Sequence, residues 1–233
     1  MGERIGVDDV KNSIQIAIDG PAAAVKSTIA KLAAEELGFT YIDTGAMYRA
    51  ITYKALERHI DLENEEALTN LLLETKIELI PSHDGQLVYL DGENVSEAIR
   101  STLVTSSVSA VAAHASLREE MVSRQLKMAE SGGVVMDGRD IGTHVLVDAE
   151  LKVFMSATVD ERAKRRQLDN ERRGIVSHVD QLKKEIAERD KMDSERQASP
   201  LIKAKDAIYL DTTNLTINEA ANHIIQLAKE RMS

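Results

Sequence analysis

The sequence predicts an α/β protein built on a mainly parallel sheet, because short apolar runs alternate with longer segments of helical periodicity. The first run, Ile14–Ile18, is followed at once by the turn Asp19-Gly20-Pro21 and by an amphipathic stretch over Ser27–Leu37. Buried strands that alternate with helices join through right-handed crossovers and so lie parallel. A chain of 233 residues suffices for one such core with a small insertion, and not for two independent domains.

Four more short apolar segments continue this pattern along the chain. They are Tyr41–Ile42, Val134–Met136, Leu151–Met155 and Ala207–Leu210. Segments with helical periodicity separate them, so each is expected to join the same sheet as the first strand.

One region interrupts the alternation. Lys76–Ile80 and Leu87–Leu90 read as strands joined directly by the polar residues 81–86, which is typical of an antiparallel hairpin. We interpret this region as a small inserted subdomain.

Composition excludes several classes of function. A net charge of −10 argues against broad nucleic-acid binding, and no apolar run reaches the length of a membrane helix. The chain has no cysteine, which excludes disulfides and thiolate metal sites. Met1–Asn12 lacks the apolar core of a secretory signal and reads as a flexible leader. A cytoplasmic monomer is the expectation, without nucleic-acid or membrane partners.

A phosphate-binding loop is predicted between the first strand and its helix. Gly20, Lys26 and Ser27 fit the pattern G-x-x-x-x-G-K-S/T, and Val25 stands where the pattern has its second glycine. In such a loop the backbone N–H groups surround phosphate, the lysine reaches the β- and γ-phosphates, and the hydroxyl binds Mg²⁺. The predicted nucleotide-binding residues are Gly20, Ala22, Ala23, Ala24, Val25, Lys26, Ser27 and Thr28. Taken alone, the incomplete motif also fits an ordinary strand-to-helix turn.

Charged and hydroxyl side chains follow two other predicted strands. Asp43, Thr44 and Arg49 follow the second strand, and Asp137, Arg139 and Asp140 follow Val134–Met136. The carboxyl ends of parallel strands share one edge of the sheet, where ligands bind. Asp137 is a candidate Mg²⁺ ligand beside Ser27, and Arg139 a candidate phosphate ligand. The alternatives are that Asp43 and Asp137 cap helices and that Arg49 and Arg139 form structural ion pairs.

In combination, several segments resemble the bacterial cytidylate kinases, a family of P-loop nucleoside monophosphate kinases. The segments are IAIDGPAAAVKST, YIDTGAMYRA, VVMDGRDIGT, ERDKMDSER and DAIYLDTT. The resemblance implies a three-layer P-loop fold over 13–233 with a five-stranded parallel sheet. It also implies a small antiparallel insertion that binds the nucleoside monophosphate, over about 76–100, and a helical lid over about 160–174.

The activity implied by the resemblance is phosphoryl transfer from MgATP to CMP or dCMP, which gives ADP and CDP or dCDP. The implied catalytic residues are Lys26, Arg139, Arg189 and Asp137, with Ser27 and Asp137 as metal ligands. Arg162 and Arg166 of the lid would bind ATP. The implied substrate-binding residues are Asp43, Thr44, Arg49, Ser109, Arg118, Arg139, Asp140, Arg189, Asp193 and Arg196.

Roles within that set also follow from the resemblance. Asp140, Ser109 and Arg118 would contact the cytosine edge, and Asp193 the sugar. The chemistry is consistent, since an acid accepts from the cytosine amino group and arginine makes planar, multidentate phosphate contacts.

Because of Val25, a hypothesis from a different functional class stays open. A β-branched residue with positive φ is strained by about 1–3 kcal/mol, whereas Ala22, Ala23 and Ala24 are small enough to raise no comparable objection. The second hypothesis is therefore a catalytically impaired CMP-binding protein whose P-loop is disabled at Val25. A GTPase fits less well, because the sequence has no Asn-Lys-x-Asp motif. A kinase for UMP is closer in chemistry to the predicted activity than a GTPase is.

Overall fold

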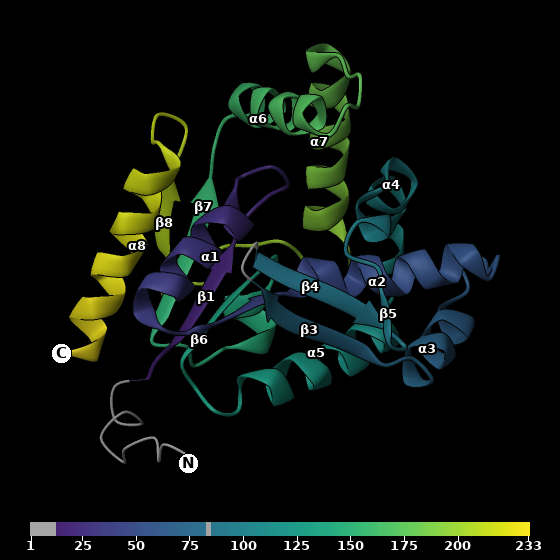
Figure 1. The fold of residues 1–233 in the computed structure, drawn as a ribbon, viewed down its shortest axis with the longest axis horizontal. Coiled ribbons are helices and arrows are strands. Elements are labelled where there is room, and N and C mark those ends of the chain that lie inside the picture. Colours follow the sequence, from purple (N-terminus) through teal and green to yellow (C-terminus); the bar gives the residue numbers. More distant parts are fainter. Residues whose placement is uncertain (1–12, 83–84) are drawn as a thin grey trace.

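The computed structural model describes residues 13–82 and 85–233, and its centre is a five-stranded parallel sheet in the order β2-β6-β1-β7-β8 (Figure 1). The strands are β1 (Gln15–Asp19), β2 (Thr40–Asp43), β6 (Val134–Gly138), β7 (Leu151–Ser156) and β8 (Ile208–Asp211). Every neighbouring pair in this sheet is parallel. The α/β prediction and its five strands are confirmed. The expected leader over 1–12 lies outside the described residues.

Helices cover both faces of this sheet. On one face, α1 (Lys26–Leu37) and α8 (Ile217–Met232) pack against Ile16, Ile18 and Val153. On the other face, α5 (Ala115–Ala129) contributes to a cluster with Ala17 and Met136. Successive strand residues point to opposite faces, so Ile16 and Ile18 serve one layer while Ala17 serves the other. The result is the predicted three-layer arrangement.

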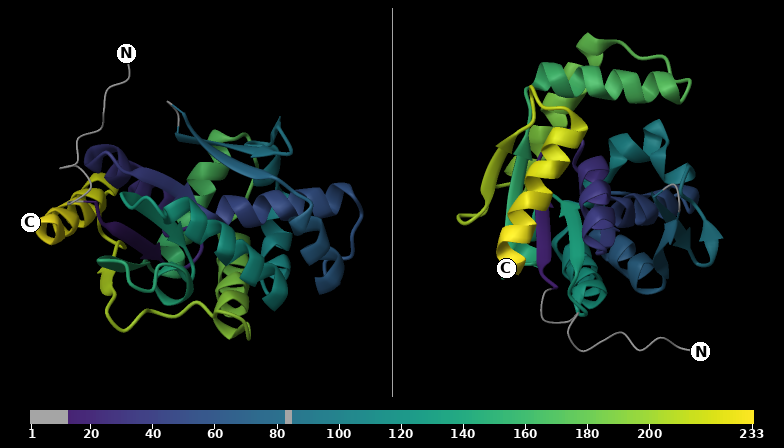
Figure 2. Two further views of the ribbon diagram at one scale, coloured as in Figure 1. Left: turned by 90° about the horizontal axis from the view of Figure 1, so that it is seen from below. Right: turned by 60° about the vertical axis from the view of Figure 1, so that its left-hand side comes forward.

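A second core lies beside the sheet. It contains α2 (Thr44–Glu57), α3 (Glu65–Leu73), α4 (Thr102–Val111) and the one-turn helix η2 (Ala98–Arg100). These pack with an antiparallel sheet of β3 (Ile77–Ser82), β4 (Gly85–Leu90) and β5 (Glu93–Asn94). The left view of Figure 2 shows this sheet over α2.

The predicted hairpin is confirmed, but its loop is shorter than the expected 81–86. Pro81 pairs with Gln86, and Ser82 with Gly85. Pro81 can sit in β3 because β3 is an edge strand, where a missing N–H costs no ladder bond.

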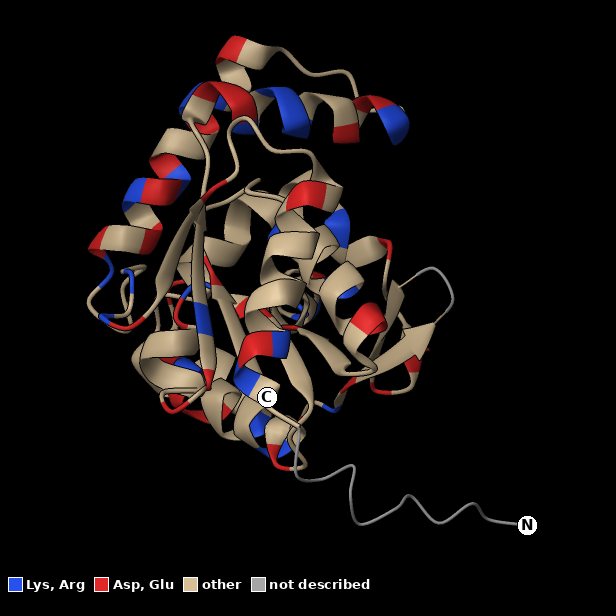
Figure 3. Cartoon of the chain, turned by 90° about the vertical axis from the view of Figure 1, so that its left-hand side faces the viewer, with Lys and Arg blue, Asp and Glu red and all other residues tan. Residues whose placement is uncertain are grey.

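Two consecutive helices, α6 (Val159–Arg172) and α7 (Val179–Glu195), stand over the carboxyl edge of the main sheet and cross at a steep angle, at the top of Figure 1. Ala163, Leu182 and Ile186 form the small apolar contact between them. Acidic and basic residues alternate along these helices (Figure 3). Helix α6 and its exit coincide with the segment predicted as a lid. Among the described residues, no helix combines the length and apolar character needed to span a bilayer.

Candidate active site

A cleft of about 410 Å³ opens between the carboxyl edge of the main sheet and the helices α6 and α7. It brings together most of the predicted site residues. Those that line it are Ala22, Ala23, Ala24, Val25, Lys26, Ser27, Thr28, Asp43, Thr44, Arg49, Ser109, Arg118, Asp137, Arg139, Asp140, Arg166, Arg189, Asp193 and Arg196. Gly20 and Arg162 are the two predicted residues that do not line it.

Gly20 has a structural role at the start of the loop. Its φ is 151°, and a Cβ at this position would lie 2.1 Å from the carbonyl oxygen of Met155 on β7. Only glycine allows this close approach of two backbones. Gly20 therefore lets the chain leave β1 beside β7 and does not itself line the cleft.

The loop keeps a left-handed backbone at two residues that are not glycine. Val25, at the N-cap of α1, has φ 55° and ψ 21°, and Ala23 has φ 57°. The expectation that only Val25 is strained was wrong, because Ala23 has a Cβ in the same unfavourable region. The loop thus adopts this backbone in spite of the substitution, at a cost of about 1–3 kcal/mol for each residue.

Lys26 begins α1 and is almost completely buried, at 5% exposure. Its Nζ donates to the carbonyl oxygen of Pro21 at 2.9 Å. Burial, with repulsion from Arg139, lowers the pKa of Lys26 to about 7, against the attraction of Asp137 and Asp19. An anion such as phosphate in the cleft would favour its charged form.

Asp137 ends β6 beside the first turn of α1. One of its carboxylate oxygens accepts from Ser27 Oγ at 2.9 Å, and the other from Tyr41 Oη at 2.7 Å. Burial and the nearby Asp43 raise the pKa of Asp137 to about 6, while Lys26 opposes this shift.

Ser27 and Asp137 fit a magnesium ion, although the described residues hold no cluster of three acidic or histidine ligands. Mg²⁺ takes hard oxygen ligands, and usually one or two carboxylates together with substrate phosphates. With Mg–O bonds of about 2.0–2.1 Å, adjacent ligands of an octahedron lie about 2.9 Å apart. The separation of Ser27 Oγ and Asp137 Oδ2 is also 2.9 Å.

The residues that follow β2 have both structural and cleft-facing roles. Asp43 caps α2 by accepting from Ala46 N at 2.7 Å, and it pairs with Arg49 at 3.0 Å. The helix-cap alternative for Asp43 is therefore correct, and it coexists with a position in the cleft. Thr44 Oγ1 donates to the carbonyl oxygen of Asp137 at 2.7 Å, which ties α2 to β6.

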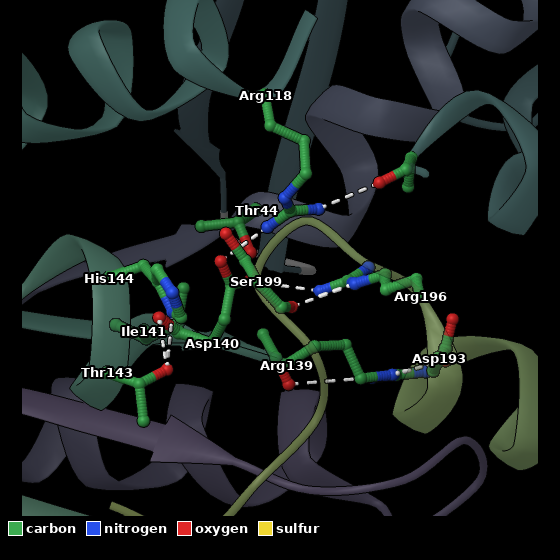
Figure 4. A network of polar contacts seen from close by, with 12 residues as sticks. Thr44, Arg118, Arg139, Asp140, Ile141, Thr143, His144, Asp193, Arg196 and Ser199 are labelled. Carbon is green, nitrogen blue, oxygen red and sulfur yellow. Dashed lines mark hydrogen bonds and ion pairs between the residues drawn. The ribbon is translucent and has the colours of Figure 1, made fainter. Parts of the chain in front are cut away.

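A buried polar network forms the inner wall of the cleft (Figure 4). Arg118 of α5 pairs with Asp140, donates to the carbonyl oxygen of Ala112 at 3.0 Å and lies over the ring of Tyr48. Asp140 also faces Arg196 at 3.5 Å. Both residues of the Arg118–Asp140 pair are almost fully buried, so the pair forms a rigid set of donors and acceptors.

Helix α7 supplies the neighbouring part of the network. Asp193 accepts from Arg139 Nε at 2.9 Å and from Ser109 Oγ at 3.2 Å. The opposite charge of Arg139 keeps the pKa of Asp193 below its usual value in spite of burial. The structural ion pair weighed for Arg139 is thus present, and Arg139 also lines the cleft.

Arg189, one helical turn before Asp193, carries charge that is incompletely paired. Its Nε has no hydrogen-bond partner among the described residues, and the same holds for Arg49 Nε. Burial and repulsion from Arg139 lower the pKa of Arg189 to about 10, and Arg49 and Arg166 add to this repulsion. Asp193 offsets part of this repulsion, and a bound anion such as phosphate would offset more of it.

Arg162 lies behind the loop and outside the cleft. Its guanidinium donates to the carbonyl oxygens of Ala157 and Ala22 and pairs with Asp190 at 2.6 Å. Arg162 lies in the first turn of α6, close to the end of β7, which places it against the loop and not over the cleft. Arg166, one turn later, lines the cleft as expected. Of the two lid arginines predicted to bind ATP, only Arg166 therefore borders the cleft.

Sequence reasoning also missed residues that the structure brings to the site. Arg100, Arg165 and Arg172 line the cleft without an assigned role. Only helical spacing could have separated Arg165 from Arg162, and it does not reveal which face of α6 turns inward. Asp19, at the end of β1, accepts from the backbone N–H groups of Ile141 and Gly142 at 2.8 Å each. It thereby anchors the π-helical turn η3 (Ile141–Val145) that follows Asp140.

A smaller cavity of about 170 Å³ adjoins the cleft. Val25, Arg165 and Ile217 line both spaces. The remaining lining residues of the smaller cavity are Ile29, Glu161, Thr212, Leu215, Thr216 and Ala220. This space is mostly apolar and lies between α1, α6 and the start of α8.

A phosphate-binding loop after β1, which faces an arginine-lined cleft at the carboxyl edge of a parallel sheet, defines a phosphotransferase of the P-loop kinase class. The family model described as cytidylate kinase matches residues 16–230. The chain therefore belongs to the cytidylate kinase family, and its substrates are small-molecule nucleotides.

Related proteins align with this sequence over nearly the whole chain. A cytidylate kinase of Lysinibacillus sphaericus is 64% identical over 223 residues, which cover 96% of this chain and 100% of that protein. Cytidylate kinases of Anoxybacillus flavithermus and of a Geobacillus species are 59% and 57% identical, and each alignment covers 96% of this chain. These alignments cover 99% and 100% of those two proteins.

Proposed function

We propose that this chain transfers the γ-phosphate of MgATP to CMP or dCMP, which gives ADP and CDP or dCDP. An oxygen of the acceptor phosphate forms the new bond to the γ-phosphorus, and the bond between that phosphorus and the β,γ-bridging oxygen breaks. The observation that carries the proposal is the single cleft that places the P-loop opposite incompletely paired arginines. Family membership and the names of the relatives support the same reaction.

The donor side consists of the P-loop and α6. The backbone N–H groups at the start of α1 and the ammonium of Lys26 would hold the β- and γ-phosphates. Ser27 and Asp137 would hold Mg²⁺, which when bound neutralises charge that develops between these phosphates. Arg165 and Arg166 face the same space from α6. We assign the donor base to the smaller, mostly apolar cavity beside Val25.

The acceptor side consists of α2, α7 and the network around Asp140. Arg49, Arg139 and Arg189 would hold the acceptor phosphate, since they border the cleft and repel one another without an anion. Asp140, with Ser109 and Arg118, would contact the cytosine edge, and Asp193 the sugar. An acid at this position accepts from the cytosine amino group, where UMP has a carbonyl oxygen.

Two segments are proposed to move. The antiparallel sheet with η2, over about 76–100, would serve as the insertion that encloses the acceptor, and α6 with its exit as the lid. Lid closure would exclude water, which otherwise competes as phosphoryl acceptor. A monomeric state and a cytoplasmic location stay predictions.

The family and the relatives favour a working kinase over the impaired alternative, and the strain at Val25 is expected to weaken ATP binding without abolishing it. The test is a coupled ADP-release assay with MgATP and, in turn, CMP, dCMP and UMP. We expect ADP release that depends on CMP or dCMP, and much slower release with UMP. ADP release that does not depend on any of the three acceptors would contradict the proposal.

A further inference from the structure

Tyr41 contacts Asp137, the carboxylate proposed as a magnesium ligand, although no role was assigned to it from the sequence. It lies on the edge strand β2, and its hydroxyl donates to Asp137 Oδ1 at 2.7 Å. Ser27 Oγ donates to the other oxygen, Oδ2, at 2.9 Å. Tyr41 is 9% exposed and Asp137 4% exposed, so the contact is shielded from water.

The Tyr41 hydroxyl determines how the Asp137 carboxylate is turned. A carboxylate that rotates about its Cβ–Cγ bond exchanges the places of its two oxygens. A charge-assisted hydrogen bond to Oδ1 opposes that rotation and holds Oδ2 toward Ser27. The 2.9 Å spacing of the two magnesium ligands therefore depends on Tyr41 as well as on Ser27 and Asp137.

Gln86 of the inserted sheet holds the end of β2 that carries Tyr41. Its side-chain amide donates to the carbonyl oxygen of Tyr41 at 2.6 Å and accepts from Asp43 N at 3.1 Å. The amide occupies the side of β2 on which the main sheet has no further strand. Lys31 of α1 covers the ring of Tyr41 at 5.7 Å. Gly85, which begins β4, also lies close to Lys31 of α1, since a Cβ at Gly85 would lie 2.5 Å from Lys31 Nζ.

We propose that Tyr41 is a positioning residue for the magnesium ligand Asp137, and that Gln86 supports it from the inserted sheet. The proposal rests on the proposed function only in taking Asp137 and Ser27 as the metal ligands. It assigns a role in metal binding to a hydroxyl that does not itself contact the metal or the nucleotide.

The test uses Tyr41→Phe, which removes only the hydroxyl. Manganese binding to the ADP-bound protein, measured by electron paramagnetic resonance, is expected to weaken about tenfold, as for the loss of one hydrogen bond to a charged group. CMP binding without metal should stay within about twofold of the parent, since Arg118 and Asp140 are untouched. Tyr209→Phe is the matched control, because Tyr209 is exposed on β8. Manganese affinity within about twofold of the parent, or an equal loss in Tyr209→Phe, would overturn the proposal.

Gln86→Ala tests the second half of the proposal. We expect a smaller loss of manganese affinity than in Tyr41→Phe, and no additional loss when the two changes are combined, because both act through one hydroxyl. Losses that multiply in the double variant would refute the role of Gln86. If the parent protein binds manganese and ADP but transfers no phosphate to CMP, the proposed function fails, while the manganese affinities still decide the role of Tyr41.

Discussion

Arg118 of α5 and Asp140 after β6 form a buried ion pair, although 22 positions separate them in the chain. Each is almost fully shielded from solvent, and Arg196 lies on the far side of Asp140. Charges removed from water in this way are stable only when they are paired and hydrogen-bonded. A change at either residue is therefore expected to affect folding and, under the proposed function, recognition of the acceptor as well.

Asp140→Asn is expected to raise the KM for CMP about tenfold to a hundredfold and to reduce the preference for CMP over UMP. The amide presents a donor where the carboxylate accepts, and it leaves Arg118 without its counter-charge. Steady-state kinetics with both acceptors measure this effect. Asp206→Asn is the control, since Asp206 is an exposed partner of Lys152 on the surface. An unchanged CMP-to-UMP ratio in Asp140→Asn would contradict the role of this carboxylate.

Val25→Gly is expected to lower the KM for ATP about threefold to tenfold and to leave CMP binding unchanged. Glycine relieves the left-handed strain at φ 55° and removes a side chain that borders both cavities. Ala24→Gly is the matched control, because Ala24 is outside the set of residues with positive φ. If both variants change the KM for ATP equally, strain at Val25 is not the cause.

Lys26→Met is expected to reduce turnover at least about a hundredfold and to make the nucleotide-free protein more stable at pH 7. Burial lowers the pKa of Lys26 to about 7, from about 10.5 in the unfolded chain. Between these values the unfolded chain binds more protons than the folded one, so the contribution of Lys26 to stability improves as the pH rises. Urea unfolding from pH 7 to 9 should show a steeper rise in the parent than in Lys26→Met. Parallel curves would show that Lys26 does not titrate in this window.

Arg162→Ala is expected to affect mainly stability, whereas Arg166→Ala is expected to affect mainly ATP binding. Loss of Arg162 should cost about 1–3 kcal/mol of folding free energy, because Asp190 and the carbonyl oxygen of Ala22 lose their donor. Loss of Arg166, which is partly exposed and pairs with Asp169 only at 3.9 Å, should leave stability nearly unchanged and raise the KM for ATP. Thermal unfolding and ATP kinetics on both variants separate these effects. A stability loss in Arg166→Ala as large as in Arg162→Ala would argue against this division.

Local sequence patterns were sufficient to predict the helices and strands and the position of the site. The strand over Ile14–Ile18, the loop and the helix from Ser27 follow from apolar periodicity and turn residues within short windows. The placement of Asp43 and Asp137 at one edge follows from parallel topology, which brings the carboxyl ends of strands together. The error at Ala23 has a different origin, since the φ of a loop residue is not encoded in side-chain size alone.

By itself, then, the sequence determined the α/β fold, the position of the phosphate-binding loop and the family. Only the tertiary structure decided which arginines face the cleft, since Arg162 and Arg166 share one helix and differ only in what packs beside them. It also decided which groups surround Asp137, where Tyr41 and Ser27 meet from two elements that are distant in the chain. The periodicity of apolar residues indicates whether a side chain is buried. Which residues it contacts depends on how separate helices and strands pack together.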